Sequence, residues 1–85
     1  MPGDGISEGT LSRTELGELA ELFDRFHFAF DPTEPAAKEA ESEFNRRLAG
    51  LFEVRIRTKH PKVSFDAFAG RVRAWCWEFL KKNKP

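Results

Sequence analysis

The 85-residue sequence contains one cysteine and no tyrosine, and it has no long run of apolar residues. Because a disulfide needs two thiols, the lone Cys76 excludes an internal disulfide and a zinc site built on paired cysteines. No stretch approaches the ~20 apolar residues of a transmembrane helix, and no secretory signal pattern is present. We therefore expect a cytoplasmic protein that does not interact with a membrane.

The sequence also lacks net charge, because 14 Lys and Arg residues balance 14 Asp and Glu residues. The two signs are nevertheless segregated. Residues 1–43 hold eleven acids and three bases, whereas residues 44–85 hold eleven bases and three acids. Such a distribution either attracts parts of the fold to each other or gives the surface two oppositely charged faces. A net charge near zero also favours self-association, because it weakens the repulsion between copies.

The length predicts a single domain. Nine phenylalanines and two tryptophans supply the apolar side chains for a core. Residues 1–11 contain three glycines and no apolar periodicity, so we predict a flexible tail there. Residues 12–85 are expected to form one helical domain.

A first helix is predicted to begin at Ser12 and to end at Asp31–Pro32. Ser12 and Glu15 have the spacing of a capping box, in which each side chain binds a backbone N–H group. The residue before a proline avoids helical geometry, so Asp31 is a natural end point. The apolar positions recur at helical spacing and form one stripe: Leu16, Leu19, Ala20, Phe23, Phe26, His27 and Phe30.

A second helix is predicted to follow, with Thr33 as its N-cap and Pro35 in its first turn, where the missing N–H group costs nothing. Its apolar stripe consists of Ala37, Ala40, Phe44, Leu48 and Leu51.

Residues 53–58 fit two structures. Val54 and Ile56 alternate with charged residues, as in a strand. The candidate partner strand within the chain is 26–30, where phenylalanines also alternate. Because 26–30 fits the first helix equally well, continuous helix is the preferred interpretation.

The third helix is predicted to begin after a break at 59–63, with Ser64 as its cap. Its stripe consists of Phe65, Phe68, Ala69, Val72, Trp75, Cys76, Phe79 and Leu80. Three helices with short links predict an all-α three-helix bundle. The expected buried residues include Phe23, Phe44, Leu48, Phe68, Val72 and Phe79.

The charge segregation suggests how these helices pair. Acidic helix 1 should run beside the basic second half of helix 2, and the Lys81–Lys82 end of helix 3 should approach Glu39 and Glu41. Exposed ion pairs contribute only ~0–1 kcal/mol each, so they select the topology more than they stabilise it.

We find no pattern typical of an enzyme, a metal site or a cofactor site. Cys76 lies between Trp75 and Trp77, where a thiol packs as a small apolar group. A Cys–His pair with His27 or His60 would lack a third orienting group. His27 and Asp31 could share a helix face, but without the spacing of a zinc motif.

Protein–protein interaction is the predicted function. Leu22, Phe28 and Trp77 lie off the apolar stripes, and Arg55, Arg57 and Arg73 complete the candidate contact residues. Exposed aromatic side chains flanked by arginine are typical of interface hot spots. We expect a small adaptor or regulatory module whose partner is another protein or a second copy of the chain.

The alternative function is binding to nucleic acid through the basic C-terminal half. The basic cluster consists of Arg46, Arg47, Arg55, Arg57, Lys59 and Lys62. The start of the third helix, residues 64–68, offers no Arg, Asn or Gln to read base edges, so contact would be limited to phosphates. The salt dependence of binding distinguishes the two functions. Affinity for phosphates falls steeply as ionic strength rises, whereas contact through Leu22, Phe28 and Trp77 should tolerate salt.

Overall fold

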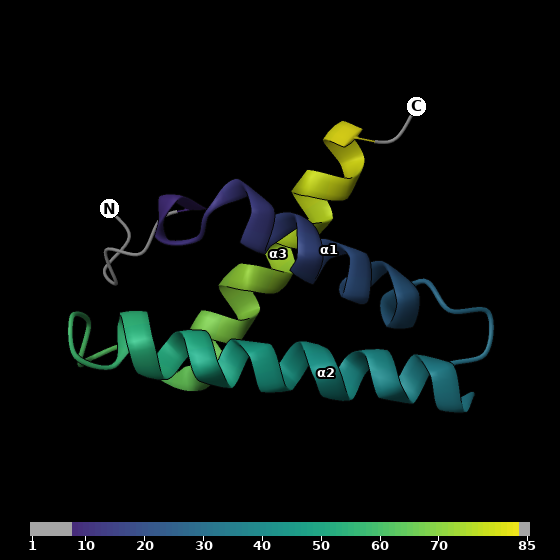
Figure 1. Cartoon of the computed structure of the whole chain (residues 1–85), viewed down its shortest axis with the longest axis horizontal. Coiled ribbons are helices and arrows are strands. Elements are labelled where there is room, and N and C mark those ends of the chain that lie inside the picture. Colours follow the sequence, from purple (N-terminus) through teal and green to yellow (C-terminus); the bar gives the residue numbers. More distant parts are fainter. Residues whose placement is uncertain (1–7, 84–85) are drawn as a thin grey trace.

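A computed structural model describes residues 8–83, in which three α-helices are connected by short links (Figure 1). The elements are η1 (Glu8–Thr10), α1 (Arg13–His27), α2 (Pro35–Leu51), η2 (Phe52–Ile56) and α3 (Phe65–Asn83). The described residues include no strand. The predicted all-α, three-helix fold is confirmed.

Helix α1 packs against both other helices. In Figure 1, α1 lies above α2, and α3 crosses behind both so that its C-terminal end projects beyond α1, away from α2. Lys82 therefore lies beside Leu11 and Arg13, near the start of α1. The expected approach of the Lys81–Lys82 end to Glu39 and Glu41 is wrong, because α3 crosses α1 instead of running alongside it.

The capping box at the start of α1 is confirmed. The Ser12 hydroxyl accepts the Glu15 N–H at 3.0 Å, and the Glu15 carboxylate accepts the Ser12 N–H at 2.9 Å. The helix ends at His27 with Phe28 as its C-cap, earlier than predicted. His27 and Phe30 are both exposed, Phe30 fully (106%), so their predicted place on the buried stripe is wrong.

At the start of α2, Pro35 lies in the first turn as predicted, but Glu34 occupies the N-cap position without a side-chain hydrogen bond. The Thr33 N–H and hydroxyl both donate to Asp31 Oδ1, at 3.0 and 2.6 Å. The prediction of Thr33 as cap is therefore wrong, because Asp31 closes a local turn that engages the Thr33 hydroxyl.

Element η2 is a π-helical turn that continues α2. Apolar side chains recur at intervals of four residues along this segment: Ala40, Phe44, Leu48, Phe52 and Ile56. An α-helix has 3.6 residues per turn, so a repeat of four drifts around its surface. The wider turn, closed by the Arg57 N–H donating to the Phe52 carbonyl at 2.9 Å, absorbs this drift and leaves Ile56 fully buried. The preferred helical interpretation holds through Ile56, residues 57–59 form a turn, and the strand alternative is wrong.

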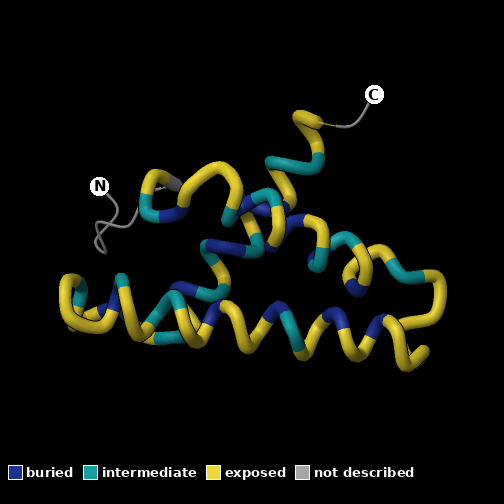
Figure 2. The backbone as a smooth tube through the Cα atoms, in the orientation of Figure 1, coloured by how far each residue is buried: buried dark blue, intermediate teal, exposed yellow. Residues whose placement is uncertain are grey.

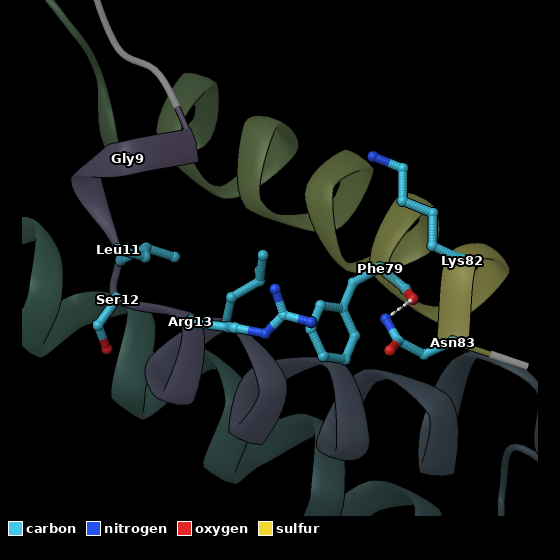
Figure 3. Close-up of a pocket in the computed structure, with 8 residues that line it drawn as sticks. Gly9, Leu11, Ser12, Arg13, Phe79, Lys82 and Asn83 are labelled. Carbon is cyan, nitrogen blue, oxygen red and sulfur yellow. Dashed lines mark hydrogen bonds between the residues drawn. The ribbon is translucent and has the colours of Figure 1, made fainter.

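The core lies where the three helices meet, as the dark blue segments of Figure 2 show. The predicted core residues Phe23, Phe44, Leu48, Phe68 and Val72 are buried. Phe79 is only partly buried, so its prediction is wrong. Its ring lies at the edge of the core, beside the start of α1 (Figure 3).

The fold includes part of the predicted tail. Glu8–Thr10 form the short helix η1, and Leu11 is 5% exposed within the core cluster. Residues 1–7 of the predicted tail lie outside the described residues, as do residues 84 and 85 of the predicted domain. No helix within residues 8–83 is long and apolar enough to cross a membrane.

Candidate interaction surface

Two exposed aromatic rings meet where the end of α1 contacts α3. Phe28 is the C-cap of α1, and its ring stacks on Trp77 of α3 with centroids 5.3 Å apart and an interplanar angle of 22°. Phe28 is 44% exposed and Trp77 is 42% exposed. The exposed His27 ring meets both, with its centroid 4.7 Å from that of Phe28 and 6.1 Å from that of Trp77. We call His27, Phe28 and Trp77 the aromatic patch.

The aromatic patch is attached to the core through Phe23. The buried Phe23 ring stacks on His27 at 4.5 Å and contacts Phe28 edge-on at 6.3 Å. Phe23 also contacts Phe26 and Phe44 inside the core. Because the buried Phe23 ring contacts both His27 and Phe28, these two exposed rings are held in place and lose little side-chain freedom on binding.

Arg73 lies on α3 one helical turn before Trp77. Its guanidinium carbon is 5.4 Å from the ring centroid of Phe26 and 5.4 Å from that of Phe44. This is cation–π geometry, in which the positive charge faces the negative faces of the rings. Among the described residues, no carboxylate lies within ion-pair distance of Arg73.

The structure places the other three predicted contact residues elsewhere. Leu22 is half-buried and faces a groove of about 710 Å³ between α1 and α2, which Phe30 also lines. Arg57 pairs with Glu53 at 2.6 Å on the surface. Arg55 pairs with Glu15 at the start of α1. Phe28, Trp77 and Arg73 are the members of the predicted set that the fold brings together.

Arg55 fastens η2 to the start of α1. Its guanidinium binds both carboxylate oxygens of Glu15, at 2.5 and 2.6 Å, and donates to the Thr10 carbonyl at 3.1 Å. Hydrogen bonding to Arg55 first, and then to the Ser12 backbone, lowers the pKa of Glu15 from 4.5 to about 2. Glu15 in turn raises the pKa of Arg55. Arg55 thus connects η2 to the start of α1.

Acidic helix α1 pairs with the basic second half of α2, as predicted. Arg47 bonds to Glu18 of α1 at 3.1 Å and to Glu43 at 3.0 Å, and Arg46 bonds to Glu43 at 2.6 Å. Much of the charge in the predicted basic cluster is thus matched by carboxylates within the fold.

A separate hollow of about 450 Å³ lies between the start of α1 and the end of α3 (Figure 3). Arg13 and Lys82 line it, and Asn83 Nδ2 donates to the Phe79 carbonyl at 2.8 Å. Leu11 and Leu16 also line this hollow, and among its lining residues in the described part of the chain none is an Asp, Glu, His or Cys. Arg13 and Lys82 give the hollow positive charge.

The remaining candidates for chemistry lie apart. Cys76 is fully buried, and desolvation raises the pKa of its thiol to about 12, so the thiolate nucleophile is suppressed. The ring contacts of His27 are with Phe23, Phe28 and Trp77. Within residues 8–83 no group of three His, Cys, Asp or Glu side chains is arranged to hold a metal ion.

No protein-family model matches this chain, and no curated protein or solved structure matches it either. Sequence reasoning did not place His27 in the patch or Arg73 against buried rings. For Arg73, the sequence held one indication of its place beside the patch: Arg73 and Trp77 are four residues apart, which puts both on one face of a helix.

Proposed function

We propose that the protein is a small non-catalytic interaction module that self-associates through the aromatic patch. The observation that carries this proposal is the stacking of Phe28 on Trp77 at the surface, with more than two-fifths of each residue still exposed. Tryptophan and other large aromatic side chains contribute the most binding energy per residue at protein interfaces. A pre-formed pair presents that area without a further cost for ordering loops.

A second copy of the chain is the partner that the charge distribution favours. The chain is neutral overall and acidic in one half and basic in the other. Part of this charge is paired within the fold, but Arg73 and the glutamates at the start of α2 form no ion pair among the described residues, so two copies in opposite orientation can place these unlike charges against each other. The low net charge opposes their approach only weakly. In this role the patch supplies affinity, and the charges set orientation and association rate.

Several features favour a binding module over an enzyme. They also favour a reducing, cytoplasmic compartment. The one thiol is buried with a raised pKa, and the exposed imidazole of His27 lies among aromatic rings. A single unoxidised cysteine is typical of cytoplasmic proteins. An adaptor or regulatory role is therefore proposed, because a protein that catalyses no reaction acts by binding its partners.

Nucleic-acid binding ranks second. In its favour, bases stack on exposed aromatic rings, and the patch offers the rings of His27, Phe28 and Trp77. Against it, Arg46, Arg47, Arg55 and Arg57 all form ion pairs with glutamates, which leaves less positive charge for phosphates. Affinity for nucleic acid depends mainly on such phosphate contacts.

Sedimentation velocity across a range of protein concentrations tests the proposal. The wild-type protein should form a larger species as its concentration rises. Trp77→Ala should weaken this association by about 2 kcal/mol or more, roughly thirtyfold, as hot-spot truncations do. Added salt should leave most of the affinity intact, because the patch is apolar.

Val54→Ala is the matched control. Val54 is 75% exposed but lies on η2, beside Glu15 and Glu18 near the opposite end of α1. Its truncation should leave association unchanged. A wild-type protein that stays monomeric at all concentrations would contradict self-association. A monomer that binds a labelled oligonucleotide at physiological salt would favour the nucleic-acid function.

A further inference from the structure

Arg73 has an unusual environment for an arginine. Its charge lies against the faces of the buried rings of Phe26 and Phe44, each 5.4 Å away. A ring face attracts the charge of a guanidinium, but it cannot satisfy the five N–H donors as carboxylate oxygens do. None of the carboxylates in residues 9–83 lies within ion-pair distance of this side chain. Arg73 thus lies against two ring faces and keeps N–H donors with which it can bind an anion.

Other arginines of the chain show the contrast. Arg25, Arg46, Arg47, Arg55 and Arg57 each bind a glutamate within the molecule. A planar guanidinium prefers such partners, because a carboxylate accepts two parallel hydrogen bonds from it.

Exposed carboxylates are present at the same end of the molecule as the aromatic patch. Phe28 is joined by a short link to α2 (Figure 1), which has Glu34 at its N-cap and Glu39 and Glu41 in its first two turns. All three are exposed, and within the described part of the chain none forms an ion pair. This end of the protein therefore carries Arg73, which pairs with no described carboxylate, and three glutamates, which pair with no described arginine or lysine.

We propose that Arg73 is a carboxylate-binding site, filled by a glutamate from the start of α2 of a second copy. This inference rests on the proposed self-association through the aromatic patch. Arg73 and Trp77 are four residues apart on α3 and share one face, so a copy seated on the patch comes within reach of Arg73. In a two-fold pair the contact forms twice, since each copy gives its Arg73 and its α2 glutamates to the other.

The charges favour a protein carboxylate over a nucleic-acid phosphate. A polyanion approaching Arg73 would also meet the glutamates at the start of α2 and be repelled. A second copy instead brings its own basic groups to those same glutamates. The aromatic patch then forms the apolar centre of the interface, and the Arg73 contacts fix its orientation.

A charge-swap experiment with two variants tests this contact. The first variant is Arg73→Glu. The second combines Glu34→Arg, Glu39→Arg and Glu41→Arg in one chain. Each variant alone should self-associate at least tenfold more weakly than wild type. An equimolar mixture should regain association, because both contacts between unlike variants then join opposite charges. Sedimentation velocity with one variant fluorescently labelled measures the mixed species.

Two further variants control for charge and for folding. Lys59→Glu makes the same charge change in the exposed turn after η2, and it should leave self-association unchanged. Arg73→Gln removes the charge while keeping a polar side chain over the rings. It should also weaken association at least tenfold, and circular dichroism should show that its helices remain. This variant decides the question if Arg73→Glu fails to fold.

The outcomes separate this inference from the proposed function. If Trp77→Ala dissociates but Arg73→Gln associates as wild type does, the Arg73 site is wrong and the aromatic interface stands. If the mixed variants do not regain association, α2 is not the source of the carboxylate and the inference is overturned. If the wild-type protein never associates, both proposals are overturned.

Discussion

Arg55 binds Glu15 through two parallel hydrogen bonds, with Nη1–Oε1 at 2.5 Å and Nη2–Oε2 at 2.6 Å. Glu15 also completes the cap of α1 by accepting the Ser12 N–H. One carboxylate thus joins the start of α1 to the π-helical turn η2. Because Glu15 and Arg55 are each about a third exposed, solvent screens part of their attraction.

This carboxylate should make stability depend on pH between about 4.5 and about 2. A pKa that is lower in the folded state stabilises the fold above the unfolded-state pKa, and the contribution is lost as pH falls through the folded-state value. Glu15→Gln should therefore lower the free energy of unfolding at neutral pH and flatten its decline in acid. Chemical denaturation at a series of pH values measures both effects.

Glu21→Gln is the control for this experiment, because it removes an exposed pair between Glu21 and Arg25. The shape of its stability profile in acid should match that of the wild-type protein. If Glu15→Gln gave the wild-type profile as well, the Arg55–Glu15 pair would not contribute to stability.

The second prediction concerns the effect on stability of removing a ring from the core. Phe68 is fully buried, so Phe68→Ala should lower the free energy of unfolding by about 3–5 kcal/mol. Against a total of about 5–15 kcal/mol, this is a large part of the stability. Phe30→Ala removes the same ring from a fully exposed position and should change stability by less than about 0.5 kcal/mol. Phe79→Ala should fall between them, and equal effects for Phe30 and Phe68 would contradict the fold.

Local features of the fold could be predicted from the sequence. The Ser12–Glu15 cap depends on residues three apart, and the structure contains both of its hydrogen bonds. Thr33 failed as a cap because Asp31, two residues earlier, engages its hydroxyl. Both are short-range hydrogen bonds, and sequence alone does not decide which of two competing ones forms.

The interaction surface could be predicted only in part. Phe28 and Trp77 lie off the apolar stripes, which correctly indicated exposure. Their stacking depends on the angle at which α3 crosses α1, and helical periodicity does not contain that angle. The contacts of Arg73 also depend on how the helices cross, because its ring partners Phe26 and Phe44 lie on the other two helices. The π-turn was signalled by the four-residue repeat that ends at Ile56, but a single wide turn is rare and was not expected.

A third prediction concerns Cys76. Burial raises the pKa of its thiol to about 12, so little thiolate forms in the folded protein. A thiol reagent at mildly alkaline pH should modify Cys76 slowly in the native state and quickly in denaturant. The matched measurement is the same reaction on urea-unfolded protein, followed by absorbance. Rapid modification of the native protein would show that α3 does not hold Cys76 in the core.

The last prediction uses the two tryptophans as separate reporters. Trp75 is half-buried against the core, whereas Trp77 is 42% exposed in the patch. In Trp75→Phe, the remaining Trp77 should become less accessible to acrylamide as protein concentration rises, because association covers its ring. In Trp77→Phe, the remaining Trp75 should show constant quenching over the same range, because its contacts are within one copy. Fluorescence quenching at each concentration, beside sedimentation of the same samples, gives the comparison. Association accompanied by unchanged quenching of Trp77 would place the interface away from the aromatic patch.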